Sequence, residues 1–268
     1  MREGFGPAAL ARDERWWGIP DWRSSDDYRA LESVDPQLLA WEWLRRDPGY
    51  RLAALGKADR SGVGDPWIRA GEPAAASWGL HAFEDPRLPA SLARPVWTAA
   101  DAFVLSARAF PSRDDGDSIA LHARGGLETV VLGDRQEHLL FSDGRGALRV
   151  DIVEGSLLAG WARLHYEVSG LGSAARPMSA IRTLAHLQKS GRFGRGGPRV
   201  RPRDILLLRA FDGIRDGAGQ RQLAAALLRR RELGPDWRIE QPSLRSQAQR
   251  LARDARSMAA AGFRKLLG

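Results

Sequence analysis

The sequence contains no cysteine. Disulfide bonds, thiolate catalysis and every zinc or iron–sulfur site built on cysteine ligands are therefore excluded. Long hydrophobic runs are lacking as well, since no stretch approaches the roughly 18 apolar residues that cross a membrane. The opening segment Met1–Gly6 has no apolar run of the kind found in signal peptides. We therefore expect a cytoplasmic protein that does not enter a membrane.

Recognisable catalytic motifs are also missing. Gly56-Lys57-Ala58 lacks the glycine spacing and the Ser or Thr of a phosphate-binding loop. The acidic run of Asp114, Asp115 and Asp117 lacks the alternation and terminal glutamate of an EF-hand, and predicts a hairpin turn. No serine lies in a nucleophile elbow. No metal-ligand spacing links the five histidines, His81, His122, His138, His165 and His186. We expect neither an enzyme nor a bound metal or other cofactor.

Lysine is scarce, because only Lys57, Lys189 and Lys265 accompany the arginines among the 41 basic residues. Arginine can bind a phosphate or a guanine through two hydrogen bonds, which lysine cannot do. Codon bias explains the same preference, since alanine and glycine are abundant too. The abundance of arginine therefore does not decide between these two explanations.

Charge is divided unevenly along the chain. Residues 176–268 contain 21 Lys and Arg residues against 7 Asp and Glu residues, whereas residues 1–175 contain 20 against 26. The formal charge of +8 for the whole chain thus conceals an acidic body joined to a strongly basic C-terminal segment. Such asymmetry is typical of a protein that presents one face to a polyanion. We predict double-stranded DNA as the partner.

The N-terminal segment, residues 1–56, is predicted to be a small helical domain. Asp35-Pro36 supplies an N-cap followed by a proline at the first helical position, and predicts a helix to about Arg46. Trp41 and Trp43 lie within that helix. They either form an exposed patch that binds another protein or anchor the helix on a core.

The middle of the chain is predicted to contain the sheet of an α+β fold. Residues 57–99 look like a packed but irregular connection rich in tryptophan. Residues 100–175 alternate with a period of two, as in Leu148, Val150 and Ile152. Turn clusters separate such runs. We predict a meander of five or six antiparallel strands, with one face packed on helices.

Residues 176–268 change to a helical period and predict a basic module that resembles a helix-turn-helix. One of its helices runs from about Gln220 to Leu228, and another opens at Pro242-Ser243. The second carries an apolar stripe formed by Leu244, Ala248, Leu251, Ala255 and Met258. This pair of helices is the one that we expect to dock on DNA.

The side of the last helix opposite the stripe predicts the DNA contacts. Arg245, Ser246 and Gln249 lie in its first turns, where a recognition helix meets base edges. Further along, Arg250, Arg253 and Arg256 are expected to hold phosphates. The remaining predicted contacts are Ser243 as the N-cap of this helix, and Gln220 and Arg221 on the preceding one. The alternative is an amphipathic helix whose arginines are merely solvated.

A second basic cluster precedes these helices and is interrupted by glycines and prolines. It consists of Arg192, Arg195, Arg199, Arg201 and Arg203. These arginines form either an arm that follows the phosphate backbone or a minor groove, or a flexible surface loop.

Two parts of the chain resemble known bacterial families. Asp21–Arg23 and Trp41–Arg51 resemble a short "transcriptional regulator-like" N-terminal domain, with Trp43 where phenylalanine or another aromatic is expected. Residues from about 103 to 267 resemble an uncharacterised proteobacterial C-terminal domain family. The stretches that carry this resemblance are Leu148–Gly160, Leu208–Asp212, Gly217–Ala224, Asp236-Trp237 and Ala261–Leu267. Phe263 stands in place of the family's tyrosine, and Lys265 reverses a charge.

The resemblance implies a regulator. The C-terminal family is found in regulators of the excision and transfer of integrative and conjugative elements. Some members are DNA-binding activators, and others are antiactivators that bind another transcriptional regulator. We therefore predict a bacterial DNA-binding transcriptional regulator that controls such mobile-element genes, with another regulator or RNA polymerase as a further partner. The alternatives are an antiactivator that sequesters another regulator and a nucleic-acid enzyme, although no segment supplies the carboxylate cluster that such an enzyme needs.

Overall fold

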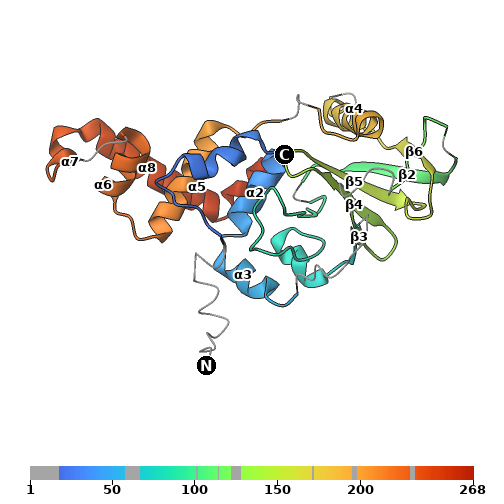
Figure 1. Ribbon diagram of the computed structural model, residues 1–268, viewed down its shortest axis with the longest axis horizontal. Coiled ribbons are helices and arrows are strands. Elements are labelled where there is room, and N and C mark those ends of the chain that lie inside the picture. Colours follow the sequence, from blue (N-terminus) through green and yellow to red (C-terminus); the bar gives the residue numbers. More distant parts are fainter. Residues whose placement is uncertain are drawn as a thin grey trace.

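The fold is α+β, as predicted, with helices from both ends of the chain and a six-stranded sheet between them in sequence. The computed structural model describes residues 18–57, 67–100, 102–113, 115–121, 128–170, 172–194, 198–229 and 233–268. The sheet lies at one end of an elongated molecule and helices α6 to α8 lie at the other end (Figure 1). This arrangement leaves the C-terminal helices projecting away from the sheet.

The N-terminal helices begin where the sequence supplies caps. A 3-10 helix, η1 (Asp26–Ser33), precedes α2 (Pro36–Leu44) and α3 (Pro48–Ala54). The Asp35 carboxylate accepts from the Gln37 N–H at 2.9 Å, which satisfies one of the free amides at the start of α2. Asp47 caps α3 in the same way. Helix α2 ends at Leu44, close to the predicted Arg46, since the residue before Pro48 is disfavoured in a helix.

The tryptophans of α2 belong to the core. Trp41 and Trp43 are both buried, and the Trp41 indole N–H donates to the Leu88 carbonyl at 2.9 Å. The interpretation of these two residues as an exposed patch is therefore wrong, and the alternative of a core anchor is confirmed. Helix α2 therefore does not provide the exposed tryptophan surface that the sequence suggested for binding another regulator.

The sheet is mixed, and the prediction of a wholly antiparallel meander is wrong. Its strand order is β1-β3-β4-β5-β2-β6, in which β1 is parallel to β3 and β2 is parallel to β5. The strands are β1 (Trp67–Ala70), β2 (Leu105–Pro111), β3 (Glu128–Leu132), β4 (Glu137–Ser142), β5 (Ala147–Glu154) and β6 (Ala162–Tyr166). Among the strands of the described residues, only β3, β4 and β5 form an antiparallel meander in chain order. Side chains alternate equally in parallel and antiparallel strands, so the pattern did not reveal which strands pair.

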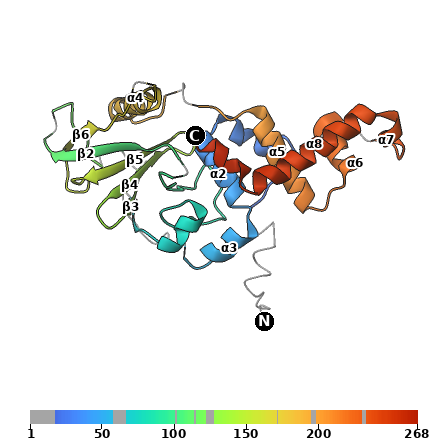
Figure 2. The ribbon, with the colours of Figure 1, turned by 180° about the vertical axis from the view of Figure 1, so that it is seen from behind.

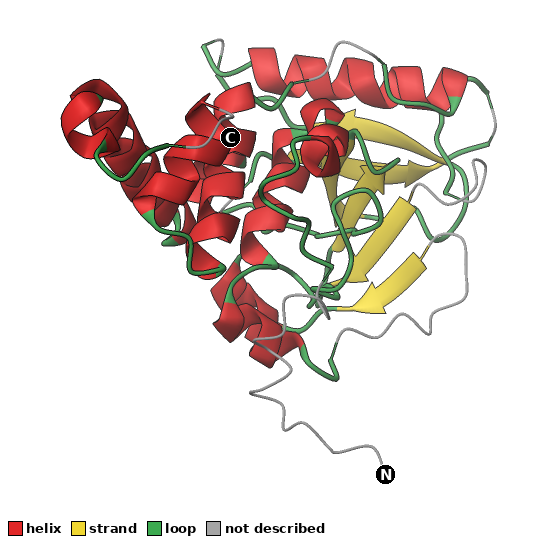
Figure 3. Cartoon of the chain, turned by 60° about the vertical axis from the view of Figure 1, so that its left-hand side comes forward, coloured by secondary structure: helices red, strands yellow, loops and turns green. Residues whose placement is uncertain are grey.

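Different segments cover the two faces of the sheet. Helix α4 (Ala175–Ser190) lies across one face, where Leu184 and Leu187 pack against residues such as Val150 (Figure 3). On the opposite face, Val131 packs with Ala82 from the connection between β1 and β2. That connection also contains the short 3-10 helix η2 (Pro73–Trp78). The segment predicted to be irregular thus contributes both a strand, β1, and part of the sheet's cover.

The C-terminal segment forms a group of packed helices, and glycine residues follow the ends of two of them. It comprises α5 (Pro202–Arg215), α6 (Gln220–Leu223) continued by the π-helical turn η3 (Ala224–Arg229), α7 (Trp237–Glu240), α8 (Pro242–Ala259) and the 3-10 helix η4 (Gly262–Leu266). Gly191 and Gly217, with φ of 67° and 78°, follow α4 and α5 in the left-handed conformation that glycine tolerates. The views from front and back both place α6, α7 and the start of α8 at the projecting end (Figure 2).

One hydrophobic core joins the N-terminal and C-terminal helices. Trp22, Leu38 and Trp41 belong to the same buried cluster as Leu208 and Leu251. Helix α5 contacts both η1 and α8, and α2 contacts α8 and η4. The helix that we expect on DNA is therefore held in place by residues from the beginning of the chain.

Asp35 lies at the junction between α2 and the sheet, where its backbone N–H donates to the Arg145 carbonyl in the turn between β4 and β5 at 2.6 Å. Burial raises the pKa of this carboxyl to about 7. A raised folded-state pKa stabilises the protein below the unfolded-state value, and that stabilisation is lost as the pH rises through about 7. We expect Asp35→Asn, which retains a capping oxygen, to be more stable than the wild type by up to about 3 kcal/mol at pH 8 and by far less near pH 4. Urea denaturation between pH 4 and pH 8 measures this difference.

The matched control is Asp47→Asn at the cap of α3, because it changes a cap without changing the junction. Comparing each variant with the wild type at the same pH cancels the titration of all other groups. A stability difference for Asp35→Asn that stays constant from pH 4 to pH 8 would refute the raised pKa.

Candidate nucleic-acid interface

Helix α8 is fixed by its predicted apolar stripe. Leu244 and Ala248 pack with Trp237 in a small cluster beneath the start of the helix. Leu251 and Ala255 belong to the large core, and Met258 packs against it while partly buried. Both halves of α8 are therefore anchored from the same side, and the other side is left to solvent.

The predicted DNA contacts of α8 all lie on that solvent side. The exposed residues are Ser243, Arg245, Ser246, Gln249, Arg250, Arg253 and Arg256. The Ser246 hydroxyl donates to the Pro242 carbonyl at 3.1 Å. Among the residues that the structure describes, no carboxylate forms an ion pair with Arg245, Arg250 or Arg256. These three guanidinium groups are available to an external anion.

The start of α8 differs from the prediction at one residue. Ser243 is not the N-cap, since Gln241 occupies that position and Pro242 is the first helical residue. Proline is suited to the first turn because its φ is already helical and it has no N–H to satisfy. No side chain caps the helix. Its first free amides therefore have no side-chain acceptor at the start of the helix, where an anion is favoured by the helix dipole.

The preceding helix α6 presents its predicted residues at its N-terminal end. Arg221 is exposed and Gln220 is half-buried. The Gly219 N–H donates to the Gln222 side chain at 2.8 Å, which closes the first turn. Both α6 and α7 contact α8, so the three helices form one structural unit.

The arginines predicted to form an arm are divided between a loop and a helix. Arg192 and Arg199 are exposed beyond α4, whereas Arg195 lies outside the described residues. Arg201 and Arg203 stand at the start of α5, where Arg201 binds both carboxylate oxygens of Asp204 at 2.9 Å. Among the described residues, two of these arginines thus lie beyond α4 and two at the start of α5.

A carboxylate connects this second cluster to α8. Arg203 lies 2.7 Å from Asp254, and Arg253 lies 3.5 Å from the same carboxylate. All three side chains are at least partly exposed, so the attraction between them is weak in water. The contact nevertheless places the start of α5 beside the middle of α8, which the sequence did not reveal.

A buried ion network connects the N-terminal helices to α5. Arg46 donates to both carboxylate oxygens of Asp212, at 2.7 and 2.9 Å, and the Tyr28 hydroxyl donates to Asp212 at 2.6 Å. Glu42 lies 2.8 Å from Arg45 and also pairs with Arg46. Burial alone would raise the pKa of Glu42, but the charges of Arg45 and Arg46 outweigh burial and lower it to about 2. Glu42 therefore remains charged at neutral pH, and Arg46 connects it to Asp212 on α5.

Trp22 adds a second connection between the same parts. Its indole N–H donates to Asp216 at 2.9 Å, and its carbonyl accepts from Arg209 at 3.0 Å. A side chain at Gly213 would bring Cβ within 2.9 Å of the Trp22 ring. Glycine thus allows Trp22 to lie directly on α5.

The structure also brings together three side chains of metal-ligand type that the sequence did not connect. The rings of His81 and His138 are stacked at 3.6 Å, and His138 Nδ1 lies 2.9 Å from an oxygen of Asp151. Arg149 donates to that same oxygen at 3.0 Å. Burial, followed by the charges of His138 and Arg149, lowers the pKa of His81 to about 4. The ligand atoms of His81, His138 and Asp151 lie within 4.8 Å of one another. Arg149 already neutralises the carboxylate, so the cluster is better suited to supporting the sheet than to binding a cation.

Two family models match the chain. Residues 172–268 match the family described as "T6SS, Transcription factor, DNA binding domain", and residues 21–81 match the "Proteobacterial transcriptional regulator-like domain". Neither the curated proteins nor the solved structures gave a significant match. The first match extends from α4 to η4 and contains every predicted DNA contact. Together the two matches support a DNA-binding transcriptional regulator.

None of the helices in the described parts of the chain is long and apolar enough to span a membrane.

Proposed function

We propose that this protein binds double-stranded DNA through the solvent side of α8 and thereby regulates transcription. The observation that carries the proposal is the exposed row of arginine, serine and glutamine side chains on α8, within the segment that matches a DNA-binding domain. An 18-residue helix is about 27 Å long and narrow enough for the major groove. The projecting position of α6, α7 and the start of α8 lets a duplex approach (Figures 1 and 2).

The position of each residue on α8 suggests its role. Arg245, Ser246 and Gln249 lie in the first turns and would meet base edges. Further along, Arg250, Arg253 and Arg256 would hold phosphates, which fix the register without reading the sequence. Ser243, and Gln220 and Arg221 at the start of α6, would contact the adjoining backbone. Arg192, Arg199, Arg201 and Arg203 would extend the phosphate contacts beyond α8.

The first test is a change of the proposed base reader. We expect Arg245→Ala to reduce discrimination between a duplex selected from a random pool and a scrambled duplex by about 1–3 kcal/mol. The loss arises because an arginine that binds guanine through two hydrogen bonds rejects other bases. Fluorescence anisotropy with both duplexes, repeated over a salt series, measures affinity and its salt dependence.

Arg253→Ala is the matched control, since it removes the same charge from a proposed phosphate contact. It should weaken binding to both duplexes alike and make the log–log salt slope less negative by about 1. Equal losses on the selected and scrambled duplexes from Arg245→Ala would contradict its role as a base reader.

The regulated genes are a further part of the proposal. The resemblance to regulators of integrative and conjugative elements supports genes for excision or transfer as the targets. The description of the matched family names T6SS, so T6SS genes are the other candidate set. We place the protein in the cytoplasm, where its DNA is, and propose RNA polymerase or a second regulator as the partner through which binding alters transcription. Mapping the bound operators across the genome decides between the two sets of genes.

A further inference from the structure

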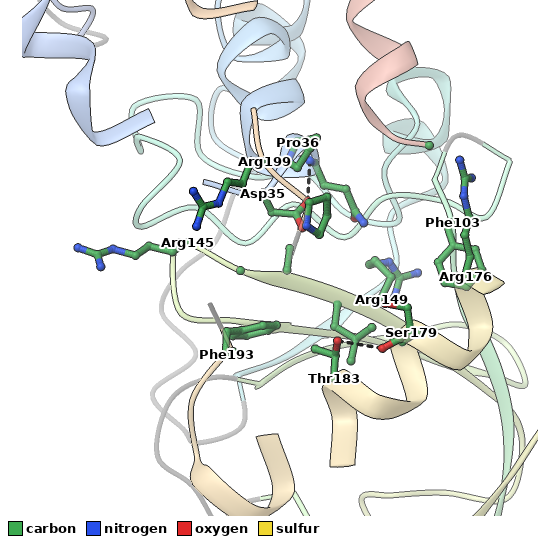
Figure 4. Close-up of a pocket in the computed structure, with 18 of the residues that line it drawn as sticks. Asp35, Pro36, Phe103, Arg145, Arg149, Arg176, Ser179, Thr183, Phe193 and Arg199 are labelled. Carbon is green, nitrogen blue, oxygen red and sulfur yellow. Dashed lines mark hydrogen bonds between the residues drawn. The ribbon is translucent and has the colours of Figure 1, made fainter. Parts of the chain in front are cut away.

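A cleft of about 1030 Å³ separates the sheet from the helices near the C-terminal end of the chain. The start of α2, the turn between β4 and β5, helix α4 and residues 266–268 line it, as do residues 193, 194, 198 and 199 (Figure 4). Its volume is at the upper end of the range of about 300–1,000 Å³ typical of small-molecule sites. None of the predicted contacts on α8 lies in it, and of the second basic cluster only Arg199 lines it among the described residues.

The cleft has an excess of unpaired positive charge. Four exposed arginines that line it have no carboxylate partner among the described residues: Arg145, Arg176, Arg182 and Arg199. A fifth, Arg149, is buried and already bonded to the Trp97 carbonyl and Asp151. Two aspartates also line the cleft. An anion entering it would therefore meet several free guanidinium groups.

Neither aspartate neutralises these arginines. Asp143 accepts backbone N–H groups from Arg145 and Gly146, at 2.9 and 2.7 Å. Asp35 is buried at the start of α2, where its carboxylate accepts from the Gln37 N–H at 2.9 Å, and burial raises its pKa to about 7. The arginines keep their attraction for an external anion.

The walls also provide contacts for the uncharged part of a ligand. The side-chain oxygen of Gln37 is buried without a hydrogen-bond donor among the described residues. Phe193 presents an aromatic ring from the opposite side (Figure 4). A Cβ at Gly146 would collide with that ring, so glycine is what lets Phe193 lie against the β4–β5 turn. An unsatisfied buried acceptor favours a ligand that brings its own N–H or O–H group.

We propose that this cleft binds a small polyanion of the phosphate or carboxylate class that also carries hydrogen-bond donors. Free guanidinium groups select the anionic groups, and Gln37 selects a donor. A duplex fits less well, because the phosphate backbone of DNA offers no donor to Gln37. The proposal goes beyond DNA binding by α8 and does not depend on it.

A ligand here would touch the segment that follows α8. Leu266 and Leu267 line the cleft, and η4, which contains Leu266, contacts both α2 and α8. The Leu267 carbonyl also accepts from the Phe103 N–H at 3.3 Å, beside the sheet. The cleft is thus in direct contact with the helices that support the DNA-binding surface.

Isothermal titration calorimetry of the full chain tests the proposal. Pyrophosphate represents the phosphate class and citrate the carboxylate class, and both are titrated at constant ionic strength. We expect at least one to bind with a dissociation constant of about 1 mM or below, and Arg145→Gln/Arg176→Gln to weaken it at least about tenfold. The control Arg113→Gln/Arg135→Gln removes the same charge from two exposed arginines outside the cleft and should bind as the wild type does.

Comparison of the dissociation constants for pyrophosphate and citrate shows whether the cleft prefers phosphate or carboxylate groups. Absence of binding by both probes at about 10 mM, or equal weakening by the two double variants, would overturn the proposal. DNA binding by Arg145→Gln/Arg176→Gln is measured in parallel. A reduced affinity for duplex and a shallower salt slope, without any pyrophosphate or citrate binding, would show that the cleft belongs to the nucleic-acid surface instead.

Discussion

Replacing Asp212 by alanine should lower the free energy of unfolding by about 3–5 kcal/mol, because it leaves buried charge without its partner. Arg46 would lose two hydrogen bonds of 2.7 and 2.9 Å, and the Tyr28 hydroxyl would lose its acceptor. Both side chains are buried, so water cannot replace what is lost. Urea denaturation of the full chain, followed by tryptophan fluorescence, measures the change.

Asp26→Ala is the control, since Asp26 lies on η1 with a side chain that is 73% exposed. Its ion pair with Arg29 on the same helix is open to solvent, and we expect a loss of about 1 kcal/mol or less. Combining Asp212→Ala with Arg46→Ala should cost less than the sum of the two single changes, because each single change already breaks the same pair. Equal urea midpoints for Asp212→Ala and Asp26→Ala would show that the network does not hold the N-terminal helices to α5.

Changing Arg250, Arg253 and Arg256 together to glutamine should weaken DNA binding about a hundred- to thousandfold near 0.1 M salt. Each proposed phosphate contact releases roughly one counterion, so the log–log salt slope should become less negative by about 3. All three side chains are exposed and point away from the core, and the fold should tolerate the change. Binding of wild type and variant to one duplex over a salt series gives both quantities.

The control for this triple variant removes three positive charges elsewhere. Lys57, Arg113 and Arg135 are exposed and lie outside α8, and glutamine at these positions matches the change in net charge. The control should retain most of the affinity and nearly the whole slope, since a distant charge is screened within about 10 Å at 0.1 M salt. If both variants lost affinity equally, binding would depend on overall charge, and the solvent side of α8 would not be the DNA surface.

Local sequence signals were sufficient for the helices. Asp35-Pro36 marked the start of α2, and the stripe from Leu244 to Met258 assigned the inner face of α8. Each of these signals acts within one or two turns of chain. The exception was Ser243, where proline at the first helical position displaced the expected cap by two residues to Gln241.

For the sheet, the alternation of apolar and polar residues predicted the strands but not the way in which they pair. The alternation at Leu148, Val150 and Ile152 placed β5 correctly, yet the same alternation fits parallel and antiparallel neighbours. The insertion of β2 between β5 and β6, and the pairing of β1 with β3, depend on partners far away in the chain. The sequence pattern contains no information about such partners.

The candidate sites show the same division between what the sequence predicts and what only the folded structure shows. Composition and helical periodicity alone determined the basic segment, its exposed arginines and the face of α8 that carries them, because these properties belong to neighbouring residues. Tertiary structure alone decided that Arg46 pairs with Asp212, that His81 stacks on His138, and that Arg145 and Arg176 border one cleft. The physical reason is that burial and the approach of distant charges arise only when separate segments pack, and these determine which charged groups are paired and which remain free for a ligand.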